Sequence, residues 1–229
     1  MIDKIYVIHY TKLDERKKNI ISILEKINIP YEFINEYDQD QLQDIKGILY
    51  NTDVLEYNRK IQVYKNHMYG IPPFRPLSDA EISCTIKHII AIKKLSEECE
   101  CGLILEDDAI PYGSDFLIEA EKSINEAPEN WGSIFIGNGC GDNFINMKEK
   151  YRVSNTLYKV NHPATNCAEA YILNKKTAKK IYDNILPFQQ ISDWEIACCF
   201  GLQNIDVYWR IPSLIYQGSI SGKFKSTLR

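Results

Sequence analysis

Three acidic residues in a row end an apolar run in the segment GLILEDDAI, residues 102–110: Glu106, Asp107 and Asp108. Ligands of open α/β sheets bind beyond the carboxyl ends of the strands, and carboxylate oxygens suit Mg²⁺ or Mn²⁺. A bound cation would offset the repulsion between the carboxylates and bridge a phosphate-bearing substrate. The segment therefore predicts a divalent-cation site, and the alternative is a solvated acidic turn after a strand.

The residues at the start of the chain predict the sheet that would carry these acids. Residues 4–10 are an apolar strand with β-branched and aromatic side chains, and residues 31–37 are a second strand. Between them, residues 13–29 place apolar side chains at helical spacing, and Pro30 lies beyond the end. This β-α-β opening predicts a parallel sheet with helices on its faces.

The clearest predicted helix lies directly before the acids. It covers residues 77–99 and starts with a capping box formed by Ser78 and Glu81. The apolar residues 102–106 are then predicted to be a central strand that is buried on both faces. Later elements are predicted as strands at 131–137 and 205–211, a hairpin arm at 151–161, a strand turning into a helix at 168–185, and a short helix with a Ser/Asp cap at 192–203.

Length, charge and cysteine usage limit the class of protein. The 229 residues suit one domain spanning 1–229, in which the polar residues 38–76 are predicted to be an insertion or a mobile loop. The net charge of −4 and the lack of a long basic run argue against nucleic-acid binding. No signal peptide or bilayer-spanning apolar run is recognised, so a cytoplasmic protein with at most peripheral membrane contact is expected. The seven cysteines lack zinc-site spacing and are interpreted as reduced core thiols.

Six segments occur in an order that is typical of one enzyme family. The most specific are LSDAEISCTIKH at 77–88 and LILEDD at 103–108, and the others are VIHYTKLDER at 7–16, TNCAEAYIL at 165–173, SDWE at 192–195 and PSLIYQGSIS at 212–221. In these segments the chain resembles glycosyltransferase family 25, the lipooligosaccharide and procollagen galactosyltransferase-like enzymes. It departs from the family pattern at His9, Ala80 and Lys87, where the family has Asn, Gly and Ser. The first departure would alter how a nucleotide is held, and the last puts a cation beside the expected site.

The resemblance implies a GT-A type, Rossmann-like mixed sheet flanked by helices in a single domain. It also implies a nucleotide-diphosphate sugar donor, UDP-galactose or UDP-glucose, and a divalent metal, Mn²⁺ or Mg²⁺. Glu106 is then expected to meet the donor ribose or a metal-bound water, Asp108 to bind the metal, and Asp107 to support them. The metal ligands are therefore predicted to be Asp108 and Glu106. No histidine occurs late in the chain, so a further ligand would be water or another oxygen.

The family resembles inverting enzymes, which need a base to take the proton of the acceptor hydroxyl. Asp193 is the first candidate and Glu195 the second, because both lie in the first turn of a predicted helix, where the helix dipole favours an ionised carboxylate. The alternative is that Asp193 or Ser192 only caps the helix.

Further residues are expected on the donor side. They are His9, Lys12, Arg16, Glu81, His88, Glu106, Asp107, Gln217 and Ser219. Two alternatives stay open: His88 is an ordinary hydrogen-bonded helix histidine near Glu81, and Lys12 and Arg16 are solvated at the start of an exposed helix.

These features predict a metal-dependent inverting glycosyltransferase. It would transfer galactose or glucose from a UDP-sugar to the hydroxyl of a glycan or of a hydroxylysine-type acceptor. One rival is a non-catalytic, GT-A-shaped protein that binds nucleotide sugars or glycans, which the departures at His9 and Lys87 keep open. A metal-dependent phosphoryl or nucleotidyl transferase ranks last, because the sequence has no P-loop.

Overall fold

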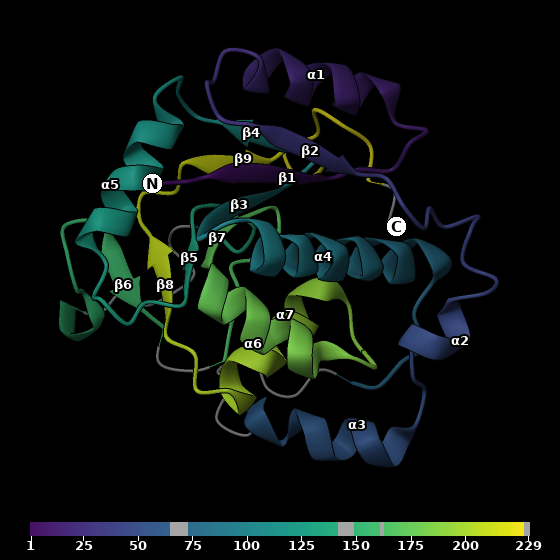
Figure 1. Ribbon diagram of the computed structural model, residues 1–229. Helices are drawn as coiled ribbons and strands as arrows, with labels where there is room; N and C mark the ends of the chain where they lie inside the picture. The colour runs from purple at the N-terminus through teal and green to yellow at the C-terminus, as the bar shows by residue number, and fades with distance from the viewer. Residues whose placement is uncertain (65–72, 142–148, 161–162, 227–229) are drawn as a thin grey trace.

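The computed structural model describes residues 1–64, 73–141, 149–160 and 163–226. Its centre is a seven-stranded mixed sheet of order β2-β1-β3-β7-β5-β8-β6, and a second sheet pairs β4 with β9 (Figure 1). The strands are β1 Lys4–Ile8, β2 Tyr31–Ile34, β3 Cys101–Glu106, β4 Ala109–Pro111, β5 Ser133–Phe135, β6 Leu157–Lys159, β7 Ala170–Asn174, β8 Val207–Arg210 and β9 Ile215–Gln217. The helices are α1 Asp14–Leu24, α2 Lys46–Leu49, α3 Val54–Lys60, α4 Asp79–Glu98, α5 Phe116–Glu126, α6 Lys175–Ile185 and α7 Ser192–Leu202, with 3₁₀ turns η1 Ile61–Tyr64 and η2 Glu149–Tyr151.

The opening of the chain forms the predicted β-α-β unit. Strand β1 lies between β2 and β3 and is parallel to both, with Ile8 opposite Glu106 in the β1–β3 register. Because the two carboxyl ends are level, the residues after β1 and the acids after β3 meet at one edge of the sheet. Strand β7 then runs antiparallel to β3 and β5. The sheet is therefore mixed: the parallel pairing suggested by the opening segment holds for β2, β1 and β3 and again for β5 with β8, whereas β7 and β6 run antiparallel to their neighbours.

Two helical layers cover the sheet. Figure 1 shows α1 and α5 on one side and α4, α6 and α7 on the other. Alternate side chains of β1 divide between the layers: Tyr6 joins the cluster under α4 and α6, and Val7 joins the cluster under α1 and α5. Strand β3 is buried on both faces, as predicted. These two apolar layers hold rigidly the strand ends that carry the acids.

The long helix α4 has the predicted start. Ser78 is its N-cap and forms a reciprocal capping box with Glu81. Its apolar residues Ile82, Ile86 and Ile89 are buried. The cap stabilises the helix by about 1 kcal/mol and fixes where its first turns lie beside the end of β3.

The structure adds detail to one expectation and corrects another. The region 38–76 contains α2, α3 and η1, and Tyr57, Ile61 and Tyr64 pack against Ala197 and Cys198 of α7. Residues 65–72 of that region lie outside the described residues, and its mobility stays a prediction. The Ser/Asp cap of α7 was wrong, because its N-cap is Ile191 and no side chain caps it.

The closing motif at 212–221 contains β9, a strand that the sequence did not predict, and β9 pairs with β4 directly after the acids. Helix α5 was also not predicted. The expected hairpin arm at 151–161 contains β6, which pairs antiparallel with β8. In the part of the chain that the structure describes, no helix combines the length and apolar composition needed to cross a bilayer.

Candidate active site

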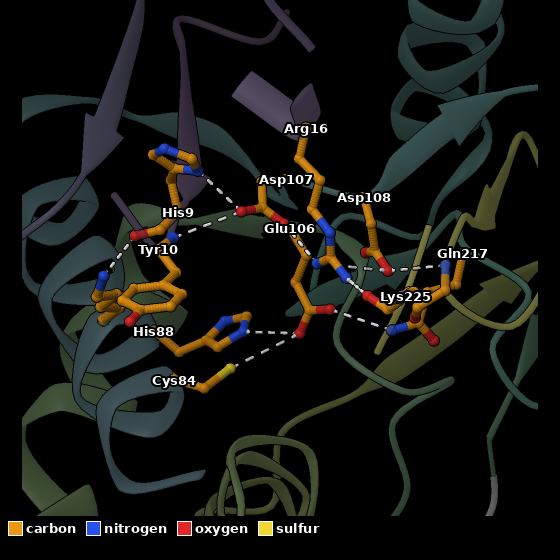
Figure 2. A network of polar contacts seen from close by, with 12 residues as sticks. His9, Tyr10, Arg16, Cys84, His88, Glu106, Asp107, Asp108, Gln217 and Lys225 are labelled. Carbon is orange, nitrogen blue, oxygen red and sulfur yellow. Dashed lines mark hydrogen bonds and ion pairs between the residues drawn. The ribbon is translucent and has the colours of Figure 1, made fainter. Parts of the chain in front are cut away.

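The three acids lie where β1, β3 and β7 meet. The backbone N–H of Asp107 donates to Ile8 O at 3.0 Å, and that of Glu106 donates to Glu169 O at 2.9 Å. These bonds fix the backbone of the acidic turn on both sides. As Figure 2 shows, the three side chains then point in different directions, so each meets its own set of partners.

Asp107 is held entirely by protein groups. Its Oδ2 lies 2.8 Å from His9 Nδ1, and its Oδ1 accepts a bond of 2.8 Å from Arg16 Nη1. The carboxyl is almost fully buried, as are the two partners. This acid therefore anchors the loop after β1 and the start of α1 to the end of β3.

The two carboxylate oxygens of Asp108 differ in their contacts. Oδ2 accepts from the backbone N–H of Ser219 at 3.0 Å, with Arg16 Nη1 at 3.9 Å. Oδ1 is buried and has no hydrogen-bond partner among the described residues. Burial, and then the charge of Glu106, raise the pKa of Asp108 to about 6. A divalent cation at Oδ1 would supply the missing partner and relieve the repulsion, so the residues present fit such an ion.

Glu106 divides its two oxygens between two groups of residues. Oε1 lies 3.3 Å from His88 Nε2 and 3.9 Å from Cys84 Sγ, both on α4. Oε2 accepts from Gln217 Nε2 of β9 at 3.3 Å. The other ring nitrogen of His88 is 2.9 Å from the hydroxyl of Tyr171. His88 is thus a fixed, buried histidine whose partners are Glu106 and Tyr171.

Glu81 is engaged elsewhere. Its carboxylate closes the capping box with Ser78 and accepts from Arg75 Nη1 at 2.9 Å. These contacts lower the pKa of Glu81, with the Arg75 hydrogen bond as the main cause. Of the two alternatives for His88, the hydrogen-bonded histidine describes its contacts, but its acidic partner is Glu106 and not Glu81.

Three further cations lie in or beside the loop after β1: Lys12 in the loop itself, Arg16 in α1 and Lys87 in α4. Lys12 is exposed and pairs with Asp40 at 2.7 Å, whereas Arg16 is buried and also donates to the carbonyl of Lys225. Lys87, which stands in place of the family serine, is buried and bonds to Asp38 and to the carbonyl of His9. Its charge is therefore matched by Asp38, and its contacts hold the loop after β1 in place.

Two pockets meet at Glu106 and Cys84. The first lies over the end of β1 and is lined by His9, Arg16 and Lys87, among others. The second is lined by residues of the closing segment, by Glu81 and by Asp193 of α7. Glu106 lines both, so one carboxylate lies between two cavities that can hold two different parts of a substrate pair.

The two candidate bases lie in different environments. Asp193 is partly exposed to the second pocket, and its Oδ1 accepts from the backbone N–H of Trp194 at 2.8 Å. Burial raises its pKa to about 6. Glu195 is fully buried, bonds to Lys60, and accepts 3.0 Å bonds from the backbone N–H groups of Gln189 and Gln190. Its carboxylate has no oxygen left for a substrate.

One buried acid was missed in the sequence. Glu169 is completely buried, its Oε1 accepts from Gly139 N at 2.6 Å, and its Oε2 has no partner in the part of the chain that the structure describes. Burial raises its pKa well above the usual range. The signal was available: Glu169 directly precedes β7, and an acid at the start of an antiparallel strand lies at the same edge as acids at the end of a parallel one.

The comparisons with known proteins agree with this architecture. TarS 1-349 of S. aureus matches with a TM-score of 0.52 and 15% identity, over 95% of this chain and 60% of TarS. A197 from STIV matches with a TM-score of 0.48 and 12% identity, over 94% of this chain and 83% of that one. A search of the curated proteins gave no match. The chain spans less than two thirds of TarS, and the likeness shows a shared GT-A fold.

The family follows from the sequence itself. The model of glycosyltransferase family 25 (LPS biosynthesis protein) matches residues 2–198, which is most of the chain. The protein belongs to this family, and it is a glycosyltransferase with the mixed-sheet GT-A fold that the motifs implied.

Proposed function

We propose that the protein transfers a hexose, galactose or glucose, from a UDP-sugar to a hydroxyl of a glycan or of a hydroxylysine-type acceptor, with inversion and with the help of Mn²⁺ or Mg²⁺. One observation carries this proposal: among the described residues, Oδ1 of Asp108 is buried without a hydrogen-bond partner, and the nearby Glu106 lines two pockets. An anionic edge of this kind suits a cation that is itself bound to a diphosphate.

Asp108 Oδ1 and Glu106 would hold the cation, and the cation would supply electrostatic stabilisation of the negative charge that develops on the departing UDP. The bond from Ser219 N orients the Asp108 carboxylate, and Gln217 orients that of Glu106. Arg16 places its charge between Asp107 and Asp108, which balances part of the acidic edge when no donor is bound.

The donor belongs in the first pocket and the acceptor in the second. The first pocket has His9, Arg16 and Gln39 in its wall, which gives polar groups for a nucleotide and its diphosphate. TarS, which has a similar fold, has been solved in complex with UDP-GlcNAc. A UDP-sugar is therefore the donor class to test first.

The acceptor base in this proposal is Asp193. It lines the second pocket together with Glu106, and a pKa of about 6 leaves it ionised at neutral pH while keeping it a stronger base than a free aspartate. Inversion requires that the base deprotonates the acceptor hydroxyl on the face opposite the leaving UDP. Glu195 serves this proposal indirectly, because its bonds to the backbone of residues 189–190 fix the start of α7.

The experiment is a donor panel in the presence of Mn²⁺ or Mg²⁺. We expect thermal stabilisation by one UDP-hexose, because a ligand that binds only the native state raises its stability, together with slow hydrolysis of that donor. Addition of EDTA should remove both effects. Binding of the donor without hydrolysis or transfer would favour the non-catalytic alternative. Release of inorganic phosphate, or transfer of the nucleotide instead of the sugar, would favour the phosphoryl or nucleotidyl transferase.

A further inference from the structure

We infer that Cys84, His88 and Glu106 form a second cation site, for a borderline to soft divalent ion of which Zn²⁺ is the type. The three ligand atoms, one from each side chain, lie within 4.8 Å of one another. This inference stands on side-chain geometry alone and needs neither the sugar donor nor the hard cation proposed at Asp108.

The distances between the ligand atoms suit a tetrahedral ion. In a zinc site with bonds of about 2.0–2.3 Å, neighbouring ligand atoms lie about 3.3–3.8 Å apart. Here Glu106 Oε1 is 3.3 Å from His88 Nε2 and 3.9 Å from Cys84 Sγ. The third pair, Cys84 Sγ and His88 Nε2, lies within 4.8 Å, so side-chain shifts of up to about 1 Å bring all three ligand atoms to the separations of a tetrahedral ion.

Helix α4 and strand β3 position these three ligands before any ion binds. Cys84 and His88 are four residues apart on α4, so they face the same side of the helix one turn apart. Glu106 comes from the end of β3, and Figure 2 shows its carboxylate aimed at both of them. The spacing of the cysteines did not indicate this site, because only one of its three ligands is a cysteine.

The histidine has the second partner that metal-binding histidines need. Its Nδ1 lies 2.9 Å from the hydroxyl of Tyr171, which fixes the ring and directs Nε2 towards Glu106. Such a partner sets the tautomer of a ligating histidine and raises the affinity for the metal. Tyr171 is fully buried, so the ring cannot turn away into solvent.

The ligand set differs in hardness from the one at Asp108. A thiolate, an imidazole and one carboxylate oxygen favour Zn²⁺ or Co²⁺ over Mg²⁺ and Mn²⁺. When the ion binds, it forms bonds to Sγ, Nε2 and Oε1, and the thiol proton is released to solvent. Three protein ligands leave the fourth position to water or to a sugar hydroxyl, because Cys84 and Glu106 line both pockets.

The shared carboxylate predicts a competition. Glu106 gives Oε1 to this site, and the same carboxylate is a proposed ligand of the hard cation. A bound Zn²⁺ therefore neutralises part of the negative charge that the cation at Asp108 needs. We expect micromolar Zn²⁺ to reduce the rate of sugar transfer in the presence of Mn²⁺.

Titration of the metal-free protein with Co²⁺ tests the site without any donor. We expect one equivalent to give the visible bands of a tetrahedral ion and a near-ultraviolet thiolate-to-cobalt band. Both should disappear on addition of Zn²⁺. Cys84→Ser should abolish the thiolate band, and Cys101→Ser, a buried cysteine in the layer under α1 and α5, should keep it.

Two further measurements make the result decisive. Tyr171→Phe should keep the thiolate band but lower the Zn²⁺ affinity about 10–100-fold, the usual effect of losing a partner of a ligating histidine. Mn²⁺ binding, followed by electron paramagnetic resonance, should be unchanged in Cys84→Ser and lost in Asp108→Asn, which separates this site from the one in the proposed function.

Cys84→Ala replaces Cys84→Ser if circular dichroism shows that the serine variant does not fold. A wild-type spectrum without a thiolate band, or one that persists without Cys84, overturns the inference.

Discussion

Arg16 Nη1 and Asp107 Oδ1 lie 2.8 Å apart, and both side chains are buried. The sequence left open whether Arg16 is solvated at the start of an exposed helix. Instead the guanidinium joins α1 to the acidic turn after β3 and reaches the carbonyl of Lys225 near the end of the described chain. Three segments far apart in sequence therefore depend on one cation.

Arg16→Gln should unfold at lower urea concentration than the wild type. Removing one partner of a buried ion pair leaves the other charge uncompensated, which costs about 3–5 kcal/mol of unfolding free energy. Lys12→Gln is the matched control, because Lys12 forms a pair of similar length with Asp40 but is exposed and should change stability little. Equal effects of the two substitutions would show that burial does not determine how much the Arg16–Asp107 ion pair contributes to the unfolding free energy.

Asp108→Asn should abolish Mn²⁺-dependent binding of UDP, because an anionic oxygen ligand is replaced by a neutral amide. The measurement is the dissociation constant of UDP with and without Mn²⁺. Asp183→Asn is the control, since Asp183 lies on α6 and pairs with the exposed Lys179. Unchanged metal dependence in Asp108→Asn would contradict the role proposed for the acidic turn.

Glu195→Gln should lower stability more than it lowers the catalytic rate per folded molecule. The carboxylate is buried against Lys60 and two backbone N–H groups, so its loss leaves a mostly buried ammonium without its carboxylate partner and costs about 3–5 kcal/mol. Urea denaturation and single-turnover rates on the same preparation measure the two effects. Wild-type stability with a large rate loss would transfer the role of base to Glu195.

The position of the acidic turn followed from the sequence because it depends on local pattern. The apolar residues of β3, the capping box of α4 and the order of β1, α1 and β2 are each set by neighbours in the chain. Together they place Glu106 to Asp108 at the carboxyl edge of a sheet, and the structure confirms that placement.

The hydrogen-bond partners of the acids could not be predicted from the sequence, because they come from distant segments. Strand β9 has only three residues, too few for a periodic pattern, yet its pairing with β4 brings Gln217 and Ser219 to Glu106 and Asp108. Likewise, nothing local to Cys84 shows that β3 ends beside it. Which carboxylate is free for a ligand, and which is bound by the protein, is therefore decided by tertiary packing.

The transfer rate should depend on pH through Asp193. The base acts in its ionised form, and its pKa is raised to about 6, chiefly by burial. We expect the rate to be nearly constant above pH 7 and to fall about tenfold per pH unit below the pKa. A profile of single-turnover rates between pH 4.5 and about 8 measures this limb, and a limb near pH 4 would mean that an unperturbed carboxyl is the base.

Stability should respond to the same group with the opposite sign. The folded protein holds the Asp193 proton more tightly than the unfolded chain, so ionisation above the raised pKa destabilises the fold. Asp193→Asn, which stays neutral, should therefore be at least as stable as the wild type at pH 7. Its advantage should shrink as the pH falls through 6 towards the unfolded-state value near 4, and urea denaturation at both ends of that range measures it.

Asp193→Asn should separate the base from the donor site. Transfer is expected to fall by about 10²–10⁴-fold, the usual contribution of a general base, while the dissociation constant of the UDP-sugar stays near that of the wild type, because only a transition-state interaction is lost. The structure removes one competing explanation, since Asp193 does not cap α7 and its loss takes no cap from the helix. Rate and affinity must be measured on the same variant. Near-normal transfer would make Asp193 a structural residue, and lost donor affinity would place it among the ligands of the cation or the sugar.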